Sequence, residues 1–246
     1  MTMTAPAPPA GDGAAVRLER VSRTFGPVTA LDEVTWAFPR GGFTAVMGPS
    51  GSGKSTFLHC ASGLDRPSGG TVRIGGVDLG RLGEAGRTRF RRERIGFVFQ
   101  AFNLIPSMSV EENIGLPLRL AGRRPDPERL AEVVRRVGLT ERAGHRPAEL
   151  SGGQQQRAAI ARALVTEPEV VFADEPTGAL DPRTAREVLR LQREAVDVAG
   201  RTIMLVTHDP VAAAWADSVV FLDRGRIVDE LVRPTVAGVL ARWEEL

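Results

Sequence analysis

The sequence is poor in the residues that form disulfides or bind metal clusters in small secreted proteins. Its 246 residues include no tyrosine and a single cysteine, Cys60. One thiol cannot form an internal disulfide, and it has no cysteine partners for a metal cluster. We therefore interpret Cys60 as a small apolar residue of the core.

Long apolar runs are also missing. No run approaches the roughly 18 to 20 residues needed to cross a bilayer, and the N-terminus lacks the charged-then-apolar order of a secretion signal. Hydrophobic residues still make up 42% of the chain, which is enough for the core of one large domain. We therefore expect a cytoplasmic, globular protein.

Lysine is nearly absent, because arginine supplies all but one of the 32 basic residues and Lys54 is the exception. The pI of 9.4 overstates how basic the protein is, since its net charge is only +2. Without tyrosine, almost nothing titrates between about pH 8 and 12. The composition gives no support for a nucleic-acid partner, and we expect none.

The order of apolar patterns predicts an α/β fold. Residues 5–15 are nearly all Ala, Pro and Gly, which predicts a flexible tail over residues 1–15 and a folded domain over 16–235. Residues 236–246 are expected to form a C-terminal helical extension. Strands are predicted at residues 16–21, 34–38, 43–47, 71–74, 95–99, 170–173, 202–206, 218–222 and 226–231. Helices are predicted at residues 54–62, 126–137, 154–165 and 182–199.

One interval is too long for a simple crossover between strands. About 70 residues separate Phe99 from Val170, and they carry helical patterns without a convincing strand. We interpret residues of about 101–165 as a helical sublobe that stands off the sheet.

A phosphate-binding loop is predicted at residues 48–55, GPSGSGKS, which fit G-x-x-x-x-G-K-[ST] between an apolar strand and a helix. Glycines let the backbone curl so that successive N–H groups point at phosphate oxygens. Lys54 adds a charge for the β- and γ-phosphates, and the Ser55 hydroxyl can ligate Mg²⁺. The plainer alternative is a Gly/Ser-rich turn. The residues expected to bind nucleotide here are Gly48, Pro49, Ser50, Gly51, Ser52, Gly53, Lys54, Ser55 and Thr56.

Two adjacent acids follow an apolar strand in VVFADEP, residues 170–176. Adjacent carboxylates after a buried strand are costly unless a cation or a polarised water lies nearby. We expect Asp174 to hold Mg²⁺ and Glu175 to polarise the water that attacks a γ-phosphate. A capping or turn role for the pair is the alternative.

A second anion site is indicated about a hundred residues after the first, in ELSGGQQQR. Ser151, Gly152 and Gly153 precede a good helical run, and the first turn of a helix has unpaired N–H groups and a positive dipole end. The predicted sublobe carries this turn away from the phosphate loop of the same chain. The second site therefore favours a nucleotide held by another copy.

With these motifs in this order, the sequence resembles the nucleotide-binding subunit of an ABC transporter over roughly residues 16–230. LSGGQ, residues 150–154, matches the family signature without a departure and adds Gln154 to the signature residues. The resemblance implies a P-loop NTPase core with a mixed sheet, an antiparallel β subdomain and a helical subdomain. It also implies a subunit that binds ATP and Mg²⁺, hydrolyses ATP and drives a membrane permease.

The resemblance implies further site residues. Gln100 matches the glutamine loop that touches Mg²⁺ and the attacking water, and Asp181, in ALD, matches a loop that crosses to the other subunit. His208, in VTHD, matches the switch histidine on the γ-phosphate. With Glu175 and Lys54, Gln100 and His208 complete the expected catalytic set. Phe25 falls where a tyrosine usually stacks on adenine, so the π-face is kept and the hydroxyl is lost.

Longer sequence stretches around the motifs resemble one group within the family. MGPSGSGKST, FVFQAFNLIPSMSVEENIGLPL and FADEPTGALD look like macrolide exporters, lipoprotein-releasing complexes and antimicrobial-peptide resistance pumps. Uptake systems for polar amino acids share the FNL stretch and remain an alternative. A non-transporting complex that transmits force to the cell envelope is another. A DNA-repair or translation ATPase is disfavoured, because there is no coiled-coil insertion and no second cassette.

Two copies are expected to enclose two ATP molecules, each between residues 48–55 of one chain and residues 151–153 of the other. We expect the permease to contact residues 100–109, from Gln100 to Ser109, and to hold the subunit at the inner face of the cell membrane. The apolar side chains of that segment are Phe102, Leu104, Ile105 and Met108. The arginine-rich stretch at residues 87–94 could meet lipid or permease, but a solvated helix face is preferred. His59 and His145 are interpreted as structural.

Overall fold

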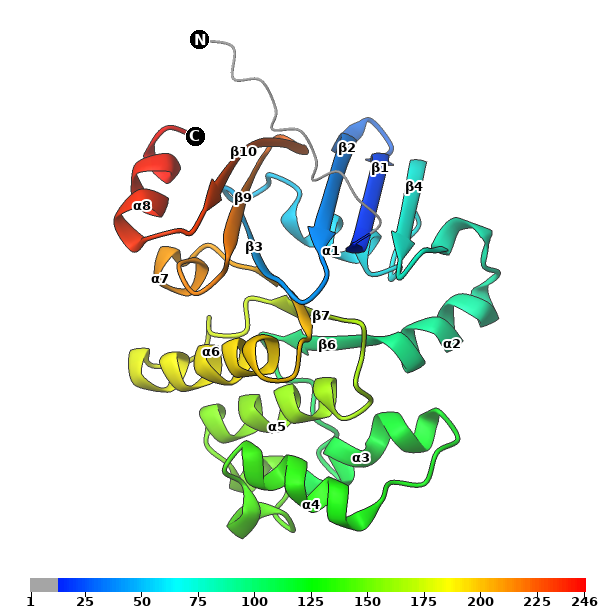
Figure 1. Ribbon diagram of the computed structural model, residues 1–246, viewed down its shortest axis with the longest axis vertical. Helices are drawn as coiled ribbons and strands as arrows, with labels where there is room; N and C mark the ends of the chain where they lie inside the picture. The colour runs from blue at the N-terminus through cyan, green and yellow to red at the C-terminus, as the bar shows by residue number, and fades with distance from the viewer. Residues whose placement is uncertain (1–12) are drawn as a thin grey trace.

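Two β-sheets form the framework of the computed structural model, which describes residues 13–246 (Figure 1). The first sheet is antiparallel, with the order β2-β1-β4-β5. Its strands are β1 (Ala14–Phe25), β2 (Val28–Pro39), β4 (Gly69–Ile74) and β5 (Val77–Asp78).

The second sheet is mixed and has the order β10-β9-β3-β8-β7-β6. Its strands are β3 (Phe43–Met47), β6 (Ile95–Phe99), β7 (Val170–Asp174), β8 (Thr202–Val206), β9 (Ser218–Asp223) and β10 (Arg226–Val232). Only β10 pairs antiparallel, against β9. Every residue of β3 and β8 is buried, which explains why these strands are apolar throughout rather than alternating.

Helices surround the mixed sheet and fill the interval between β6 and β7. They are α1 (Lys54–Ala61), α2 (Glu84–Arg94), α3 (Val110–Leu120), α4 (Pro127–Arg136), α5 (Gly152–Leu164), α6 (Pro182–Asp197), α7 (Pro210–Ala213) and α8 (Val236–Glu244). Short 3₁₀ turns lie at Leu79–Arg81, Thr140–Arg142 and Pro147–Glu149. Residues 100–169 contain no strand in the described structure. Treating residues 101–165 as a separate sublobe stays a prediction.

The N-terminal boundary differs from the sequence-based expectation. Residues 1–12 of the predicted tail lie outside the described residues, but Ala14 pairs with Pro39 and Ala15 is fully buried. A tail that reaches residue 15 is therefore wrong. Alanine has little strand preference of its own, so the pairing with β2, rather than local composition, decides where the strand begins.

Helix α3 was not predicted, because Gly115 and Pro117 lie inside it. Its start nevertheless carries a capping box, in which Ser109 Oγ accepts from the Glu112 N–H at 3.1 Å and Glu112 Oε2 accepts from the Ser109 N–H at 2.8 Å. Pro117 lies inside the helix, where proline lacks the N–H that would bond to the carbonyl four residues earlier. Leu118 behind it is buried, so packing helps to hold the last turn.

Helix α2 only partly fits a solvated face. Arg89 and Arg92 are exposed, whereas Arg87 and Phe90 are buried. Arg87 pairs with Glu84 one turn earlier, and Arg91 donates to the Gly63 carbonyl at 2.7 Å. The interpretation of residues 87–94 as a solvated face is therefore wrong for Arg87, which is 7% exposed.

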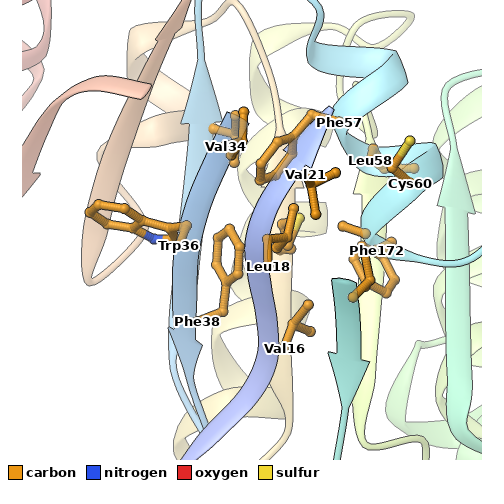
Figure 2. Close-up of a cluster of buried hydrophobic side chains, with 14 of the residues drawn as sticks. Val16, Leu18, Val21, Val34, Trp36, Phe38, Phe57, Leu58, Cys60 and Phe172 are labelled. Atoms are coloured by element: carbon orange, nitrogen blue, oxygen red, sulfur yellow. The ribbon is translucent and has the colours of Figure 1, made fainter. Parts of the chain in front are cut away.

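Three apolar clusters hold these layers together. One lies between the antiparallel sheet, α1 and the mixed sheet, and it includes Trp36, Phe38, Phe57 and Phe172 (Figure 2). Phe38 and Phe57 are in edge contact, with ring centroids 5.9 Å apart. Cys60 belongs to this cluster, and burial raises the pKa of its thiol to about 12. A second cluster lies under α6, α7 and α8 on the opposite face. The third joins α3, α4 and α5.

None of the described helices is both long and apolar enough to cross a membrane. This finding concerns residues 13–246 only.

The segment before α3 is held by one buried amide. Asn113 is fully buried, and its Nδ2 donates to the carbonyls of Ile105, Met108 and Ser109 at 3.0 to 3.2 Å. Its Oδ1 accepts from the Ile105 N–H at 2.7 Å. This side chain replaces the backbone pairing that an irregular segment lacks.

We expect Asn113→Ala to destabilise the protein by about 1 to 3 kcal/mol, because it leaves buried backbone groups unpaired. Urea unfolding followed by circular dichroism measures the loss. The control is Arg119→Ala on the exposed side of the same helix, for which a change within about 0.5 kcal/mol is expected. Equal stability of the two variants would contradict the role of Asn113.

Candidate functional site

The loop between β3 and α1 has the curvature expected of a phosphate cradle. A Cβ at Gly48 would lie 2.0 Å from the Leu222 carbonyl oxygen, and one at Gly53 would lie 2.4 Å from that of Ala30. Gly53 also has φ of 103° and precedes α1 without a side-chain cap. Only glycine fits these two positions, and the N–H groups of the first turn of α1 stay available to an anion.

Lys54 folds over this loop. Its Nζ donates to the carbonyls of Gly48 at 2.7 Å and Pro49 at 2.9 Å. Burial lowers the pKa of Lys54, and the charges of Glu175 and Asp174 oppose that shift. The ammonium therefore lies within electrostatic reach of both acids predicted from the sequence.

Asp174 and Glu175 leave the end of β7, which lies between β6 and β8. The pKa of Asp174 is raised, mainly by burial and then by the charge of Glu175, while His59 and Lys54 act in the opposite direction. His59 therefore lies within electrostatic reach of Asp174, and its interpretation as structural stays a prediction. Its position in α1, five residues after Lys54, gave no ligand spacing that could have identified it.

Glu175 is held in a defined orientation. It adopts φ of 46°, and its N–H donates to the Val206 carbonyl at 2.9 Å. Its Oε1 lies 2.8 Å from His208 Nδ1, and Thr207 Oγ1 donates to its Oε2 at 3.3 Å. The side chain of Glu175 is 18% exposed against 68% for His208, so the acid is recessed and the imidazole stands at the surface.

Gln100 reaches the same turn from β6. A Cβ placed on Gly178 would lie 3.0 Å from Gln100 Nε2, and the Gly178 N–H donates to the Glu175 carbonyl at 3.1 Å. The structure thus brings Gln100, Glu175 and His208 to one edge of the sheet.

Glu175 and His208 border a cavity of about 720 Å³, whereas Gln100 and Asp174 are not among its lining residues. Its walls include Gly48, Ser50, Gly51, Gly53, Lys54, Ser55, Thr56, Glu175, His208, the start of β2 at residues 28–30, and Trp243. Phe25, the last residue of β1, is 48% exposed and carries the Arg23 guanidinium 4.4 Å from its ring centroid. It does not border this cavity, so its role beside an adenine stays a prediction.

Residues 151–153 lie elsewhere. They begin α5 in the lower lobe of Figure 1, well away from α1, and are not among the residues that border the Lys54 cavity. Ser151 Oγ accepts from the Gln154 N–H at 3.3 Å, and Gln154 Oε1 accepts from the Ser151 N–H at 2.9 Å. Ser151 is exposed, and the N–H groups of Gly152 and Gly153 fall in a first turn without intrahelical acceptors.

Gly153 also has a packing reason to be glycine. A Cβ there would lie 2.2 Å from Thr184 Cγ2 in α6, whereas one at Gly152 would make only ordinary contacts of 3.6 Å and more. The sequence suggested that both glycines bare the backbone for an anion. In the structure, the lack of a side chain at Gly153 allows α5 to approach α6 closely.

Asp181 caps α6. Its carboxylate accepts from the N–H groups of Arg183 and Thr184 and from the Thr184 hydroxyl, and the bonds from Thr184 lower its pKa. Both oxygens are therefore engaged within this chain. Its predicted reach to the other subunit stays a prediction.

Sequence reasoning missed Arg162, which ties α5 to the segment after Gln100. Its guanidinium donates to the carbonyls of Phe102, at 2.8 Å, and Asn103. Both of those residues have positive φ, 59° and 51°, a conformation that needs support from its surroundings. An arginine on a largely apolar helix was the available signal. Arg162 therefore joins the helix of residues 151–153 to the loop that follows Gln100.

We expect Asp174→Asn to raise the melting temperature of the nucleotide-free protein at about pH 7.5, because it removes a charge that burial and Glu175 disfavour. The folded-state pKa of Asp174 lies above its ordinary value of 3.8. The wild-type penalty is therefore full above the raised pKa and disappears as the pH falls towards 3.8. Differential scanning fluorimetry across that range measures the gain.

The matched control is Asp223→Asn, at the end of β9, where the carboxylate lies 3.9 Å from Arg224. No gain is expected there. An Asp174→Asn protein that melts below wild type at neutral pH would show that the carboxylate is stabilised in the folded state.

Comparison with known proteins agrees with this geometry. Residues 31–178 match the sequence pattern of the family described as ABC transporter. The macrolide export ATP-binding/permease protein MacB of Rhodospirillum rubrum is 46% identical over 91% of this chain and 35% of its own length. Methionine import ATP-binding protein MetN 2 of Burkholderia mallei is 47% identical over 93% of this chain and 59% of its own. This chain thus spans less than two thirds of either relative.

Shorter relatives match along almost their whole length. The lipoprotein-releasing system ATP-binding protein LolD 1 of Rhodospirillum rubrum is 43% identical over 87% of this chain and 98% of its own. The dimeric structure of the bacterial ABC transporter cassette MJ0796 superposes with a TM-score of 0.82 at 38% identity, over 89% of this chain and 99% of that one. A dimeric post-hydrolysis state of the same cassette, bound to ADP and Pi, gives 0.81. The chain therefore belongs to the ABC transporter family and has the fold of its ATP-hydrolysing, nucleotide-binding domain.

Proposed function

We propose that the chain is the ATPase subunit of a membrane transporter and that two copies enclose two ATP molecules in shared sites. The observation that carries this proposal is the separation, within one chain, of the Lys54 cavity from the exposed start of α5. The cavity offers donors and charge on one side only. The start of α5 offers a second set of N–H groups with no phosphate of its own to bind.

The free energies of a few hydrogen bonds to phosphate are large enough to switch the pair of copies between an open and a closed state. Moving an open-to-closed ratio from 99:1 to 1:99 takes about 5.5 kcal/mol, and a hydrogen bond to a charged group contributes about 1.5 to 3 kcal/mol. A few contacts from residues 151–153 of each copy to a terminal phosphate of the other suffice. Because hydrolysis removes those phosphates from the interface, closure ends with cleavage.

Each cavity residue has a role in this proposal. The loop at residues 48–56 binds the phosphates, and Lys54 supplies the charge that balances them. Glu175 orients and deprotonates the attacking water, since its carboxylate is recessed and fixed by Thr207 and His208. His208, exposed at the rim, contacts the terminal phosphate, and Gln100 reports its presence to the segment that follows.

The donor set fits Mg²⁺. Among the described residues there is no cluster of three or more His, Cys, Asp or Glu side chains that could hold a metal, but Mg²⁺ in nucleotide sites needs only one or two protein oxygens beside the phosphates. Ser55, Gln100 and Asp174 supply oxygens of that kind. The raised pKa of Asp174 marks a buried carboxylate that a cation stabilises. When bound, Mg²⁺ neutralises charge on the transferred phosphoryl group.

The direction of transport is the finer part of the proposal. We favour export or extraction, because MacB and LolD are named for these activities and the sequence shares the wording of that group. Import is the second candidate, since the methionine import protein MetN 2 is equally similar.

A groove beside the Gln100 loop fits the membrane partner. It has a volume of about 470 Å³ and lies between α2, β6, α3 and α5. Its apolar lining is Ile95, Phe97, Phe99, Leu116, Pro117 and Leu120, and Arg91, Arg92 and Arg162 stand at its edges. Leu120 is 57% exposed. We assign the groove to a helix of an integral membrane permease that carries an acidic residue, which would hold the subunit at the inner face of the membrane.

This placement refines the contact expected over residues 100–109. Leu104 and Ile105 are half-buried, and Leu104 packs against the cluster of α3, α4 and α5. Of that segment, Asn103 alone is among the described residues that line the groove, next to Phe99 at the end of β6.

We expect Glu175→Gln to bind ATP with Mg²⁺ and to accumulate as a dimer, because the closed state forms but cleavage is blocked. Size-exclusion chromatography with light scattering measures the mass. A monomer at saturating ATP and Mg²⁺ would overturn the shared-site proposal.

A matched double variant separates nucleotide binding from pairing. Adding Ser151→Arg to Glu175→Gln places a bulky cation where the partner's phosphate is expected, without touching the Lys54 cavity of the same chain. This protein should still bind ATP and stay monomeric. ATP-dependent dimers of the double variant would exclude residues 151–153 from the interface.

The groove is tested by introducing a negative charge at its apolar rim. We expect the wild type to co-purify with an integral membrane protein from detergent extracts, and Leu120→Asp to lose that protein while ATP-dependent dimerisation stays unchanged. Val198→Asp, at a site that is 77% exposed and distant from the groove lining, is the control and should retain it. Equal retention by both variants would place the permease elsewhere.

A further inference from the structure

One wall of the nucleotide cavity comes from a part of the chain that the proposed function does not use. Trp243 borders the cavity together with Ser50, Lys54, Glu175 and His208. It is the one residue of α8 among the described lining residues. The other walls are the phosphate loop, the start of β2 and the ends of β7 and β8.

Helix α8 is fixed in place, so Trp243 is not a loose chain end. Thr235 caps the helix by accepting from the Gly238 N–H at 3.1 Å, and Val239 is fully buried. Trp243 follows Val239 by four residues and therefore lies on the same face. Arg242 pairs with Asp229 of β10 at 3.1 Å.

The same packing connects Trp243 to His208. Helix α7 begins two residues after His208, its Ala212 and Ala213 are fully buried, and α8 packs against it (Figure 1). Trp243 and Val239 belong to the apolar cluster that contains those two alanines. The indole and the imidazole are therefore carried into the cavity by two helices that pack on each other.

Core packing alone does not account for Trp243. The three tryptophans differ in their surroundings: Trp36 is 2% exposed and belongs to the core between the sheets, while Trp215 and Trp243 are both half-buried against the second cluster. Trp215 borders a different cavity, beside Arg157 and Arg190. Trp243 alone combines an anchored side with a side that faces the nucleotide cavity.

We propose that Trp243 is a nucleotide-contacting residue at the terminal-phosphate end of the ATP site, and that α8 forms the wall of the site on that side. The indole excludes water from the space beside Glu175 and His208, which strengthens charge-assisted contacts to a phosphate. The packing of α8 on α7, which begins two residues after His208, places Trp243 on the His208 side of the cavity, whereas Phe25 does not border it. This placement predicts a stronger effect on ATP than on ADP.

This inference rests on the proposed function, so its test measures nucleotide binding independently of tryptophan. The background is the Ser151→Arg chain, which is expected to stay monomeric and therefore not to turn ATP over. Equilibrium dialysis with radiolabelled ATP and ADP gives the two dissociation constants. We expect Trp243→Ala to weaken ATP binding about three- to tenfold and ADP binding less than about twofold. Trp215→Ala is the matched control and should change both less than about twofold.

Intrinsic fluorescence supplies the second readout. We expect ATP to change the emission of the parent chain and of its Trp215→Phe variant, and to leave the Trp243→Phe variant without that change. Both phenylalanine variants keep an aromatic ring in the second cluster, so loss of folding does not explain a difference between them.

The outcomes separate failure of the proposed function from failure of the role of Trp243. If the parent chain binds no ATP by dialysis, the proposed function fails and this inference falls with it. If the parent chain binds ATP, but Trp243→Ala matches Trp215→Ala or weakens ATP and ADP equally, only the inference is overturned. Retention of the full emission change by Trp243→Phe would overturn it as well.

Discussion

The alignment of three parallel strands decides where the chemistry of this protein lies. Strands β3, β7 and β8 are adjacent and parallel in the mixed sheet, so their carboxyl ends open on one edge. Lys54 follows the first strand, Glu175 the second and His208 the third. Since the strands are buried on both faces, their order cannot change without exposing the core, and the distances between these side chains inherit that rigidity.

The cost of this arrangement is visible in the charges. Burial disfavours the ionised forms of both Lys54 and Asp174, and Glu175 adds repulsion to Asp174. Under the proposed function, such a site would be stabilised when phosphates and a divalent cation enter, because each supplies charge that the protein alone leaves unbalanced. The nucleotide is thus part of the electrostatic structure of the folded site.

The sequence predicted the parts of the fold that rest on local patterns. The bounds of β3, β6 and β8 match the predicted strands, because fully buried strands leave unbroken apolar runs between turn residues. The phosphate loop was predictable because glycine is the only residue type that the backbone contacts allow at positions 48 and 53. The start of β1 at Ala14 was not predictable, since pairing with β2 decides where the strand begins. Helix α3 was obscured by Gly115 and Pro117, although Ser109 and Glu112 marked its start.

Contacts between distant segments were beyond sequence reasoning. An arginine in α5 could be noticed from the sequence, but no local pattern identifies its partners as the carbonyls of Phe102 and Asn103. Likewise, no local pattern indicates that Trp243 borders the cavity of Lys54. The first contact ties α5 to the segment that follows Gln100, and the second joins α8 to the Lys54 cavity. Under the proposed function, a partner that docks at Ser151 and a permease that docks in the groove between α2, β6, α3 and α5 would act on the same helix, because Arg162 borders that groove and lies in α5, which Ser151 caps.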